Sequence, residues 1–539
     1  MKRILQTLLS LLLVLLWSTA RSQSAYELSA NIEVRQSPEK LRITLDSASR
    51  HTGVPVHAKY YRHPLGAEEA QRQGQSYHWK IVARGYKIRL YLQLKIHDSD
   101  SLYLYNAGGQ QVAVYTADER LPKNEVTAAV SETITLRYVA RSGKQPPLSI
   151  SGYSLQLANG GKKDGLDFGD SDFCEINIAC TEGDNFRDVE QSVVRINVKL
   201  NGFEGWCTGT LINNTAQDFT PYILTAEHCG LASGNFVGPG DLAIWEYYFN
   251  YAGENCTNPA SESEVNFTQI TGSELVARSD DNGGDFGSDF ALLRITDTAA
   301  FNNLSNPYFA GWDRSGSAPV RGVTIHHPEG DIKKISTFSS PAVSSNFGPT
   351  VSDTHWEVVW SPTTTGHGVT EPGSSGCAIL NDQGLIKGLL TGGVATCFAN
   401  TAPDYFGKFS YSWDQNGTAN NRKLQPWLDP VGTGNFVMSS AYRGDSIETG
   451  PDLAEIEIAP NPLVDGPVLR LWNLGTSSKL DVQVFDISGN LVYSREDITG
   501  LPADLGQPEL NLQRLKNGLY FVRLALPATY QTEKLIINR

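Results

Sequence analysis

Short runs in which apolar and polar residues alternate recur through the first third of the chain. The clearest are residues 77–82, 90–96, 101–105 and 133–138. Alternation at period two is typical of strands with one buried face, and Asn106-Ala107-Gly108-Gly109 is a turn signal between such runs. The pattern predicts a β-rich segment over residues 23–163. It ends in the Gly-rich stretch 160–165, which we interpret as an exposed linker.

The middle of the chain carries buried-type strands with reactive residues at their ends. Residues 222–226 form an apolar run that leads into Glu227-His228-Cys229. Asp289 lies in the run 288–293, where we expect an acid to enter a buried strand. Gly373-Ser374-Ser375-Gly376 is a Gly-rich turn that we expect to expose a hydroxyl group.

The last part of the chain has the pattern of a compact all-β module over residues 455–539, after a polar connector at 438–454. Within it, Asp486-Ile487-Ser488-Gly489-Asn490 separates two apolar runs and predicts a hairpin.

The N-terminus has the pattern of a secretory signal over residues 1–22. Lys2 and Arg3 precede an apolar run from Leu8 to Trp17, and Ala20-Arg21-Ser22 is a small-x-small cleavage site. The apolar run is too short for a good membrane span, and we expect no stable span elsewhere. These features predict export to a compartment in which disulfides persist.

Length and charge narrow the possible functions. A chain of 539 residues is expected to hold three or four domains. Its net charge of −14, from 44 basic and 58 acidic residues, argues against a nucleic-acid partner.

The seven cysteines all lie between Cys174 and Cys397, which predicts one disulfide-stapled domain. Because seven is odd, one thiol is left over, and Cys377, two residues after Ser375, is our candidate. A buried inert thiol is the favoured interpretation. A redox-sensitive thiol beside the reactive serine is the alternative.

Together, His228, Asp289 and Ser375 suggest a catalytic triad. A serine hydroxyl needs a base within hydrogen-bond reach, and His228 would supply it. Asp289 would orient the imidazole, and the N–H groups of Gly373 and Ser375 would form an oxyanion hole. The chain order His, Asp, Ser is that of chymotrypsin-type enzymes and differs from the subtilisin order, so we expect a serine endopeptidase.

Motifs across residues 174–436 resemble the lysyl endopeptidase family of trypsin-like peptidases. They lie at 174–180, 208–215, 224–230, 310–314, 325–328, 369–376 and 427–430. The resemblance implies a double β-barrel protease domain over residues 164–437. It also implies the disulfides Cys174–Cys397, Cys180–Cys256 and Cys207–Cys229. The family pattern has Ser where this chain has Cys377.

The resemblance further implies a primary pocket with Asp404 at its base. A buried carboxylate there would pair with a basic substrate side chain, Lys favoured. On the pocket-wall strand the family's His is replaced by Thr391, just before Gly392 and Gly393, so Arg-only specificity stays an alternative. Ser374 stands where most trypsin-like enzymes have Asp, and we therefore expect no activation through an ion pair with a new N-terminus.

The last module resembles the C-terminal sorting domain of the type IX secretion system. The matching motifs are at 460–462, 485–489, 517–520 and 534–536. The resemblance implies the secretion machinery as a partner and a final location outside the cell or on its surface. An ordinary Ig-like binding module is the alternative. By position, residues 23–163 would be a propeptide, and Lys163 would be a site of self-cleavage.

The expected architecture is thus mainly β, a chymotrypsin-like double β-barrel flanked by a β-rich propeptide and an Ig-like β-sandwich. Its partners would be protein and peptide substrates. We expect no cofactor and no metal, because His326-His327 would point to opposite faces of a strand and Asp280–Asp285 lacks the spacing of a calcium loop, favouring a solvated turn. The rival function is a catalytically silent surface adhesin on the same scaffold.

Overall fold

The computed structural model describes most of the chain. The described residues are 41–42, 44–45, 47–49, 54, 56–65, 70–117, 124–126, 130–157, 168–443 and, with gaps at 465, 473–478, 488, 500–507 and 527–528, 457–539. The expected signal peptide and the Lys162-Lys163 linker lie outside them. The chain divides into two compact units, and we describe each by itself.

The first unit contains Ala58–Asp164 and is built from antiparallel strands. In hydrogen-bonded order they are β1 (Val56–Leu65), β8 (Ser149–Leu157), β3 (Ser76–Gln93), β7 (Val130–Val139), β4 (Ser101–Tyr105) and β5 (Gln111–Thr116). Trp79 and Ile81, two residues apart, lie on a buried face of β3, and Leu90, which follows a register shift between Ala83 and Lys87, is buried as well. Two runs that the alternation separates, 77–82 and 90–96, belong to one strand, β3, which ends at Gln93.

The second unit begins with a sheet that carries His228. Its strands, in hydrogen-bonded order, are β16 (Thr268–Thr271), β15 (Glu246–Phe249), β10 (Val193–Leu200), β11 (Phe203–Leu211), β12 (Tyr222–Thr225), β18 (Ala291–Ile295) and β17 (Ser273–Arg278). Ile196, Ile223 and Leu293 lie in one buried core under this sheet.

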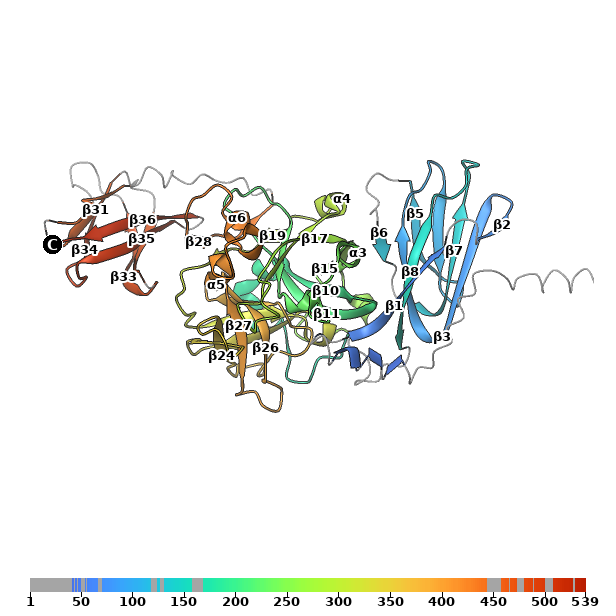
Figure 1. Cartoon of the computed structure of the whole chain (residues 1–539), viewed down its shortest axis with the longest axis horizontal. Coiled ribbons are helices and arrows are strands. Elements are labelled where there is room, and N and C mark those ends of the chain that lie inside the picture. Colours follow the sequence, from blue (N-terminus) through green and yellow to red (C-terminus); the bar gives the residue numbers. More distant parts are fainter. Residues whose placement is uncertain are drawn as a thin grey trace, which may run out of the picture. The chain divides into compact units, whose positions relative to one another are not determined.

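A second sheet carries the segment around Ser375. Its central strands, in order, are β24 (His355–Val359), β27 (Pro403–Lys408), β26 (Ile386–Gly393), β25 (Ala378–Asn381), β21 (Gly322–His326) and β22 (Lys334–Phe338). Trp356, Ile379 and Phe406 belong to its own core. These two sheets, green to orange in Figure 1, lie in the segment for which the sequence predicted a double β-barrel.

The C-terminal module is a β-sandwich. One sheet holds β30 (Glu457–Ala459), β31 (Val468–Trp472) and β34 (Glu509–Asn511), and the other holds β33 (Leu491–Thr499), β32 (Lys479–Asp486), β35 (Gly518–Leu526) and β36 (Thr529–Ile537). Leu469 and Leu510 of one sheet share a core with Val482 and Val522 of the other. The predicted hairpin joins β32 to β33, where Gly489 donates its N–H to the Asp486 carbonyl at 3.0 Å.

The mainly β fold class is therefore confirmed. Among the described residues, no helix combines the length and the apolar character that crossing a membrane requires.

Candidate active site

His228 follows the end of β12 and begins a short 3-10 turn, His228–Gly230. Its Nδ1 atom lies 2.7 Å from Oδ2 of Asp289, and its main-chain N–H donates to Oδ1 of the same carboxylate at 2.9 Å. The disulfide between Cys207 and Cys229 links this turn to β11. The structure therefore brings His228 and Asp289 together in the geometry that orients an imidazole.

The sequence suggested that Asp289 lies within a strand, but the structure places it before the strand begins. Strand β18 starts only at Ala291, and Asp289 has a φ of 53°. This left-handed backbone is incompatible with an extended strand and is unusual outside glycine. The side chain is fully buried, and both of its oxygens contact His228.

The surroundings of His228 favour its charged form. Burial alone would lower the pKa of the imidazole, but the charge and hydrogen bond of Asp289 outweigh it and raise the pKa. Glu227 and Asp281 add to the same effect. An imidazolium formed during a reaction would be stabilised here.

Ser375 lies in a turn that packs against the segment leading to His228. Its carbonyl accepts the Thr208 N–H at 2.8 Å, and a Cβ placed on Gly376 would lie 2.6 Å from the nitrogen of Ala226. Within residues 168–443, no hydrogen bond joins Ser375 to His228, and His228 Nε2 has no hydrogen-bond partner. Such contacts are often long in unliganded enzymes and tighten when substrate binds.

Gly373 gives this turn its shape. Its φ of 93° favours glycine, and a Cβ there would lie 2.8 Å from the His327 carbonyl oxygen. In the same described range, neither the Gly373 nor the Ser375 N–H donates a hydrogen bond to the protein.

Ser374 is engaged elsewhere. It is fully buried, its Oγ lies 2.7 Å from His326 Nδ1, and it accepts the Glu371 N–H at 3.2 Å. Burial lowers the pKa of His326 to about 3, so this imidazole is neutral near pH 7. The Ser374 hydroxyl is therefore held by His326 and the Glu371 N–H.

Asp404 lies buried on β27, opposite Gly393 of β26. Its Oδ2 accepts the Trp360 indole N–H and the Thr370 hydroxyl, each at 2.7 Å, while Oδ1 accepts the Ala395 N–H at 3.2 Å. Burial raises the pKa of Asp404, although these hydrogen bonds oppose the shift. No signal in the sequence links Trp360 or Thr370 to Asp404.

Thr391 and Gly392 lie beside a histidine that the sequence did not single out. His355 Nε2 lies 2.9 Å from Thr391 Oγ1, and burial lowers the pKa of His355 to about 3. The Phe347 ring is 5.7 Å from the His355 ring, and a Cβ on Gly392 would lie 3.5 Å from Phe347. A neutral His355 and an aromatic ring thus flank this strand.

The structure contains the three disulfides that the resemblance implied, Cys174–Cys397, Cys180–Cys256 and Cys207–Cys229. Cys377 is the free, buried cysteine. Burial strongly raises the pKa of its thiol, and Thr324 Oγ1 lies 3.0 Å from the sulfur. This environment suits an inert thiol.

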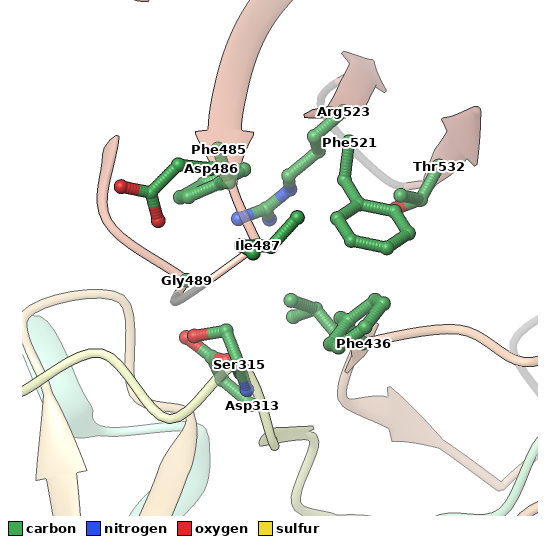
Figure 2. A pocket seen from close by; sticks show the side chains of 11 residues that line it. Asp313, Ser315, Phe436, Phe485, Asp486, Ile487, Gly489, Phe521, Arg523 and Thr532 are labelled. Atoms are coloured by element: carbon green, nitrogen blue, oxygen red, sulfur yellow. Dashed lines mark hydrogen bonds between the residues drawn. The ribbon is translucent and has the colours of Figure 1, made fainter. Parts of the chain in front are cut away.

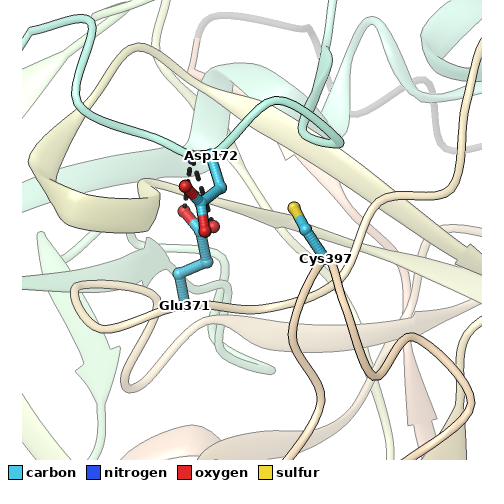
Figure 3. Close-up of side chains that lie close together, drawn as sticks. All are labelled: Asp172, Glu371 and Cys397. Carbon is cyan, nitrogen blue, oxygen red and sulfur yellow. Dashed lines mark hydrogen bonds between the residues drawn. The ribbon is translucent and has the colours of Figure 1, made fainter. Parts of the chain in front are cut away.

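Two groups of side chains among the described residues have the composition of a cation site. Asp172, Glu371 and Cys397 lie close together, and the Asp172 N–H donates to Glu371 at 3.2 Å (Figure 3). The Cys397 sulfur is already bonded to Cys174, so it offers no thiolate. The second cluster consists of Glu227, Asp281 and Asp289. Its carboxylate oxygens already accept hydrogen bonds from main-chain N–H groups of the protein.

The prediction that residues 280–285 form a solvated turn is wrong for Asp281. It is only 3% exposed, and its Oδ2 accepts the Asp289 N–H at 2.8 Å. Asp280, its neighbour, has a half-exposed side chain that pairs with Arg278. The run 280–285 is therefore partly a support of the site.

Figure 2 shows a pocket lined by 11 residues, among them Phe436, Phe521 and Arg523. None of the lining residues is a predicted catalytic or substrate-binding residue, so this pocket is separate from the candidate active site.

Known proteins resemble the chain in two segments. Residues 168–407 match the lysyl endopeptidase C-terminal domain, and residues 457–538 match the secretion system C-terminal sorting domain. A lysyl endopeptidase of Pseudomonas aeruginosa is 26% identical over 352 residues, which cover 61% of this chain and 71% of that protein.

Among solved structures, the thermostable serine protease AL20 from an extremophilic microorganism is 15% identical, covering 43% of this chain and 97% of its own, with a TM-score of 0.28. A Glu endopeptidase is 17% identical, covering 45% and 92%, with a TM-score of 0.27. These scores are too low to support an argument.

The matched segment 168–407 includes His228, Asp289 and Ser375. Residues 168–407 thus carry a domain similar to the lysyl endopeptidase C-terminal domain, residues 457–538 carry a secretion system C-terminal sorting domain, and the chain is a serine endopeptidase.

Proposed function

We propose that the enzyme cleaves peptide bonds after basic residues, Lys favoured, through an acyl-enzyme formed on Ser375. The observation that carries the proposal is the 2.7 Å contact between His228 Nδ1 and Asp289 Oδ2, with Nε2 of the same ring left without a hydrogen-bond partner among residues 168–443. A base held in this way is ready to accept a proton from a serine.

In the proposed reaction, Ser375 Oγ attacks the scissile carbonyl carbon while its proton moves to His228 Nε2. The carbonyl oxygen becomes an oxyanion that accepts hydrogen bonds from the Gly373 and Ser375 N–H groups. The C–N bond then breaks as His228 donates its proton to the leaving amine. Water, deprotonated by His228, then attacks the acyl carbon. The ester C–O bond breaks as His228 returns the proton to Ser375 Oγ, and the acid product leaves.

Asp404 would select the residue before the scissile bond. A buried carboxylate gains from pairing with a substrate ammonium or guanidinium group, and a neutral side chain would leave it unpaired. Gly393 lies directly beside Oδ1 of Asp404. A substrate side chain could approach that oxygen only because residue 393 has no side chain of its own. Thr391 and Gly392 would line the approach to the pocket.

The sorting domain indicates export to the cell surface or the extracellular space by type IX secretion. We propose passage through the periplasm and contact between residues 457–538 and the secretion machinery. The N-terminal strands would form a propeptide that maturation removes.

The test is to digest a denatured protein mixture with the purified enzyme and to sequence the new ends. We expect cleavage after Lys, with Arg second, and loss of turnover on the order of a millionfold in Ser375→Ala. Cleavage only after Arg would favour the Arg-specific alternative. Equal activity of Ser375→Ala would refute the nucleophile, and an inactive but folded wild type would favour an adhesin.

A further inference from the structure

We propose that Asp281, anchored by Glu227, is a positioning residue that holds Asp289 in place for His228. The inference rests on the proposed triad. It assigns no contact with substrate to either residue, and both act through the Asp289 carboxylate.

Each polar group of Asp289 has a hydrogen-bond partner, and only three residues supply these partners. The two side-chain oxygens contact His228 at 2.7 and 2.9 Å. The main-chain N–H donates to Asp281 Oδ2 at 2.8 Å, and the main-chain carbonyl accepts the Glu227 N–H at 3.2 Å. Asp281 and Glu227 therefore hold both backbone groups of the residue that orients His228.

Asp289 needs this support because its backbone is strained. A φ of 53° lies in the left-handed region, which costs energy for a residue with a Cβ. Such a conformation persists only where neighbouring groups over-determine it. The hydrogen bond from its N–H to Asp281 is one such constraint.

Besides its bond to the Asp289 N–H, Asp281 makes further hydrogen bonds that fix its position. Its Oδ1 accepts the Gly284 N–H at 2.9 Å, and its own N–H donates to Glu227 Oε2 at 3.0 Å. Gly284, with a φ of 92°, approaches closely enough that a Cβ there would lie 3.4 Å from the Asp289 Cβ. The turn is thus packed directly against the catalytic acid.

Glu227 ties this turn to the residue before His228. Its side chain is fully buried, and it accepts the Gly283 N–H at 3.2 Å and the Ser279 hydroxyl at 3.3 Å. The Arg278 guanidinium lies 2.6 Å from Oε1 and supplies the positive charge. The buried Glu227 carboxylate therefore links the segment before His228 to the turn at residues 279–283.

The same groups also act on His228 electrostatically. Oxygens of Glu227, Asp281 and Asp289 lie within 4.8 Å of one another. Burial, and then Asp281, raise the pKa of Glu227 to about 7. Removing Asp281 would weaken the negative environment of the imidazole, leaving Asp289, Glu227 and the Arg278 cation around it.

The test is Asp281→Asn in the full chain, assayed on a Lys ester. An amide offers one acceptor where the carboxylate offered two, so either Asp289 or Gly284 loses its partner. We expect kcat to fall about 10- to 100-fold with KM unchanged. The acid limb of the pH profile should move to lower pH.

Asp429→Asn is the matched control, because Asp429 is another buried acid that accepts loop N–H groups, from Thr433 and Gly434. We expect it to lower the Tm without changing kcat. If Asp281→Asn does not fold, Glu227→Gln replaces it, with the same expected loss of kcat at constant KM.

Unchanged kcat with an unshifted pH profile in the folded Asp281 or Glu227 variant would overturn the inference. Ser375→Ala, assayed in parallel, separates this outcome from failure of the triad. An inactive Ser375→Ala beside a fully active Asp281→Asn rejects only the positioning role. An active Ser375→Ala rejects the proposed triad.

Discussion

Gly393 lies so close to Asp404 that a Cβ on the glycine would come within 1.8 Å of the Asp404 Oδ1 atom. The two residues are register partners on β26 and β27. Because Oδ2 already accepts two side-chain donors, Oδ1 is the less occupied oxygen. A side chain at residue 393 would occupy the space directly beside that oxygen.

Gly393→Ala should therefore block the pocket. We expect kcat/KM on Lys and Arg esters to fall about 100-fold or more, because the methyl group displaces the carboxylate from the substrate charge. Gly238→Ala is the control, since residue 238 has a φ of −80° and open space around its Cβ position. Retention of full activity by Gly393→Ala would place the specificity acid elsewhere.

Asp404→Asn should remove the preference for basic residues while keeping the volume of the side chain. A desolvated substrate ammonium would lose its counter-charge, and we expect kcat/KM on Lys substrates to fall on the order of 10³-fold. Activity on small neutral esters should change far less. The exposed Asp382, paired with Arg321, gives a control in Asp382→Asn. Unaltered cleavage after Lys in Asp404→Asn would contradict the proposal.

Activity should decline on the acid side of neutrality. The proposed base works only as a neutral imidazole, and its pKa is raised above the ordinary 6.5. As pH falls through that raised value, His228 gains a proton and kcat/KM drops, so the half-maximal point should lie above pH 6.5. Measuring kcat/KM between about pH 5 and pH 9 locates this limb.

The Asp289→Asn variant tests whether the acid limb of the pH profile reports the protonation of His228. Removing the carboxylate should shift the limb to lower pH and lower kcat about 10⁴-fold, because the imidazole loses its orientation. A limb that stays in place in this variant would mean that another group titrates.

Maturation should depend on the enzyme's own activity. Lys162 and Lys163 stand in a Gly-rich stretch before the protease segment, and an exposed linker can enter a protease cleft in extended form. We expect cleavage after Lys163, leaving Asp164 as the new N-terminus. N-terminal sequencing of a secreted Ser375→Ala variant should show the uncut form. Normal processing of that variant would point to a separate protease.

Local patterns in the sequence were sufficient for much of this protein. Alternating runs predicted the strands β4 and β7, and the Asp486–Asn490 turn predicted the hairpin between β32 and β33. These features depend on neighbours a few residues apart, so the chain encodes them directly. The choice of His228 and Ser375 as candidates rested on the residue types of the turns in which they lie.

Tertiary packing decided what those patterns could not. The polar run around Asp281 has the composition of a solvated turn, yet burial against Asp289 makes it part of the site. The left-handed backbone of Asp289 and the donors that Trp360 and Thr370 supply to Asp404 likewise depend on contacts between distant segments. Burial and hydrogen bonding of this kind arise only when distant segments meet, because residue type limits which partners a side chain can take but does not select among them.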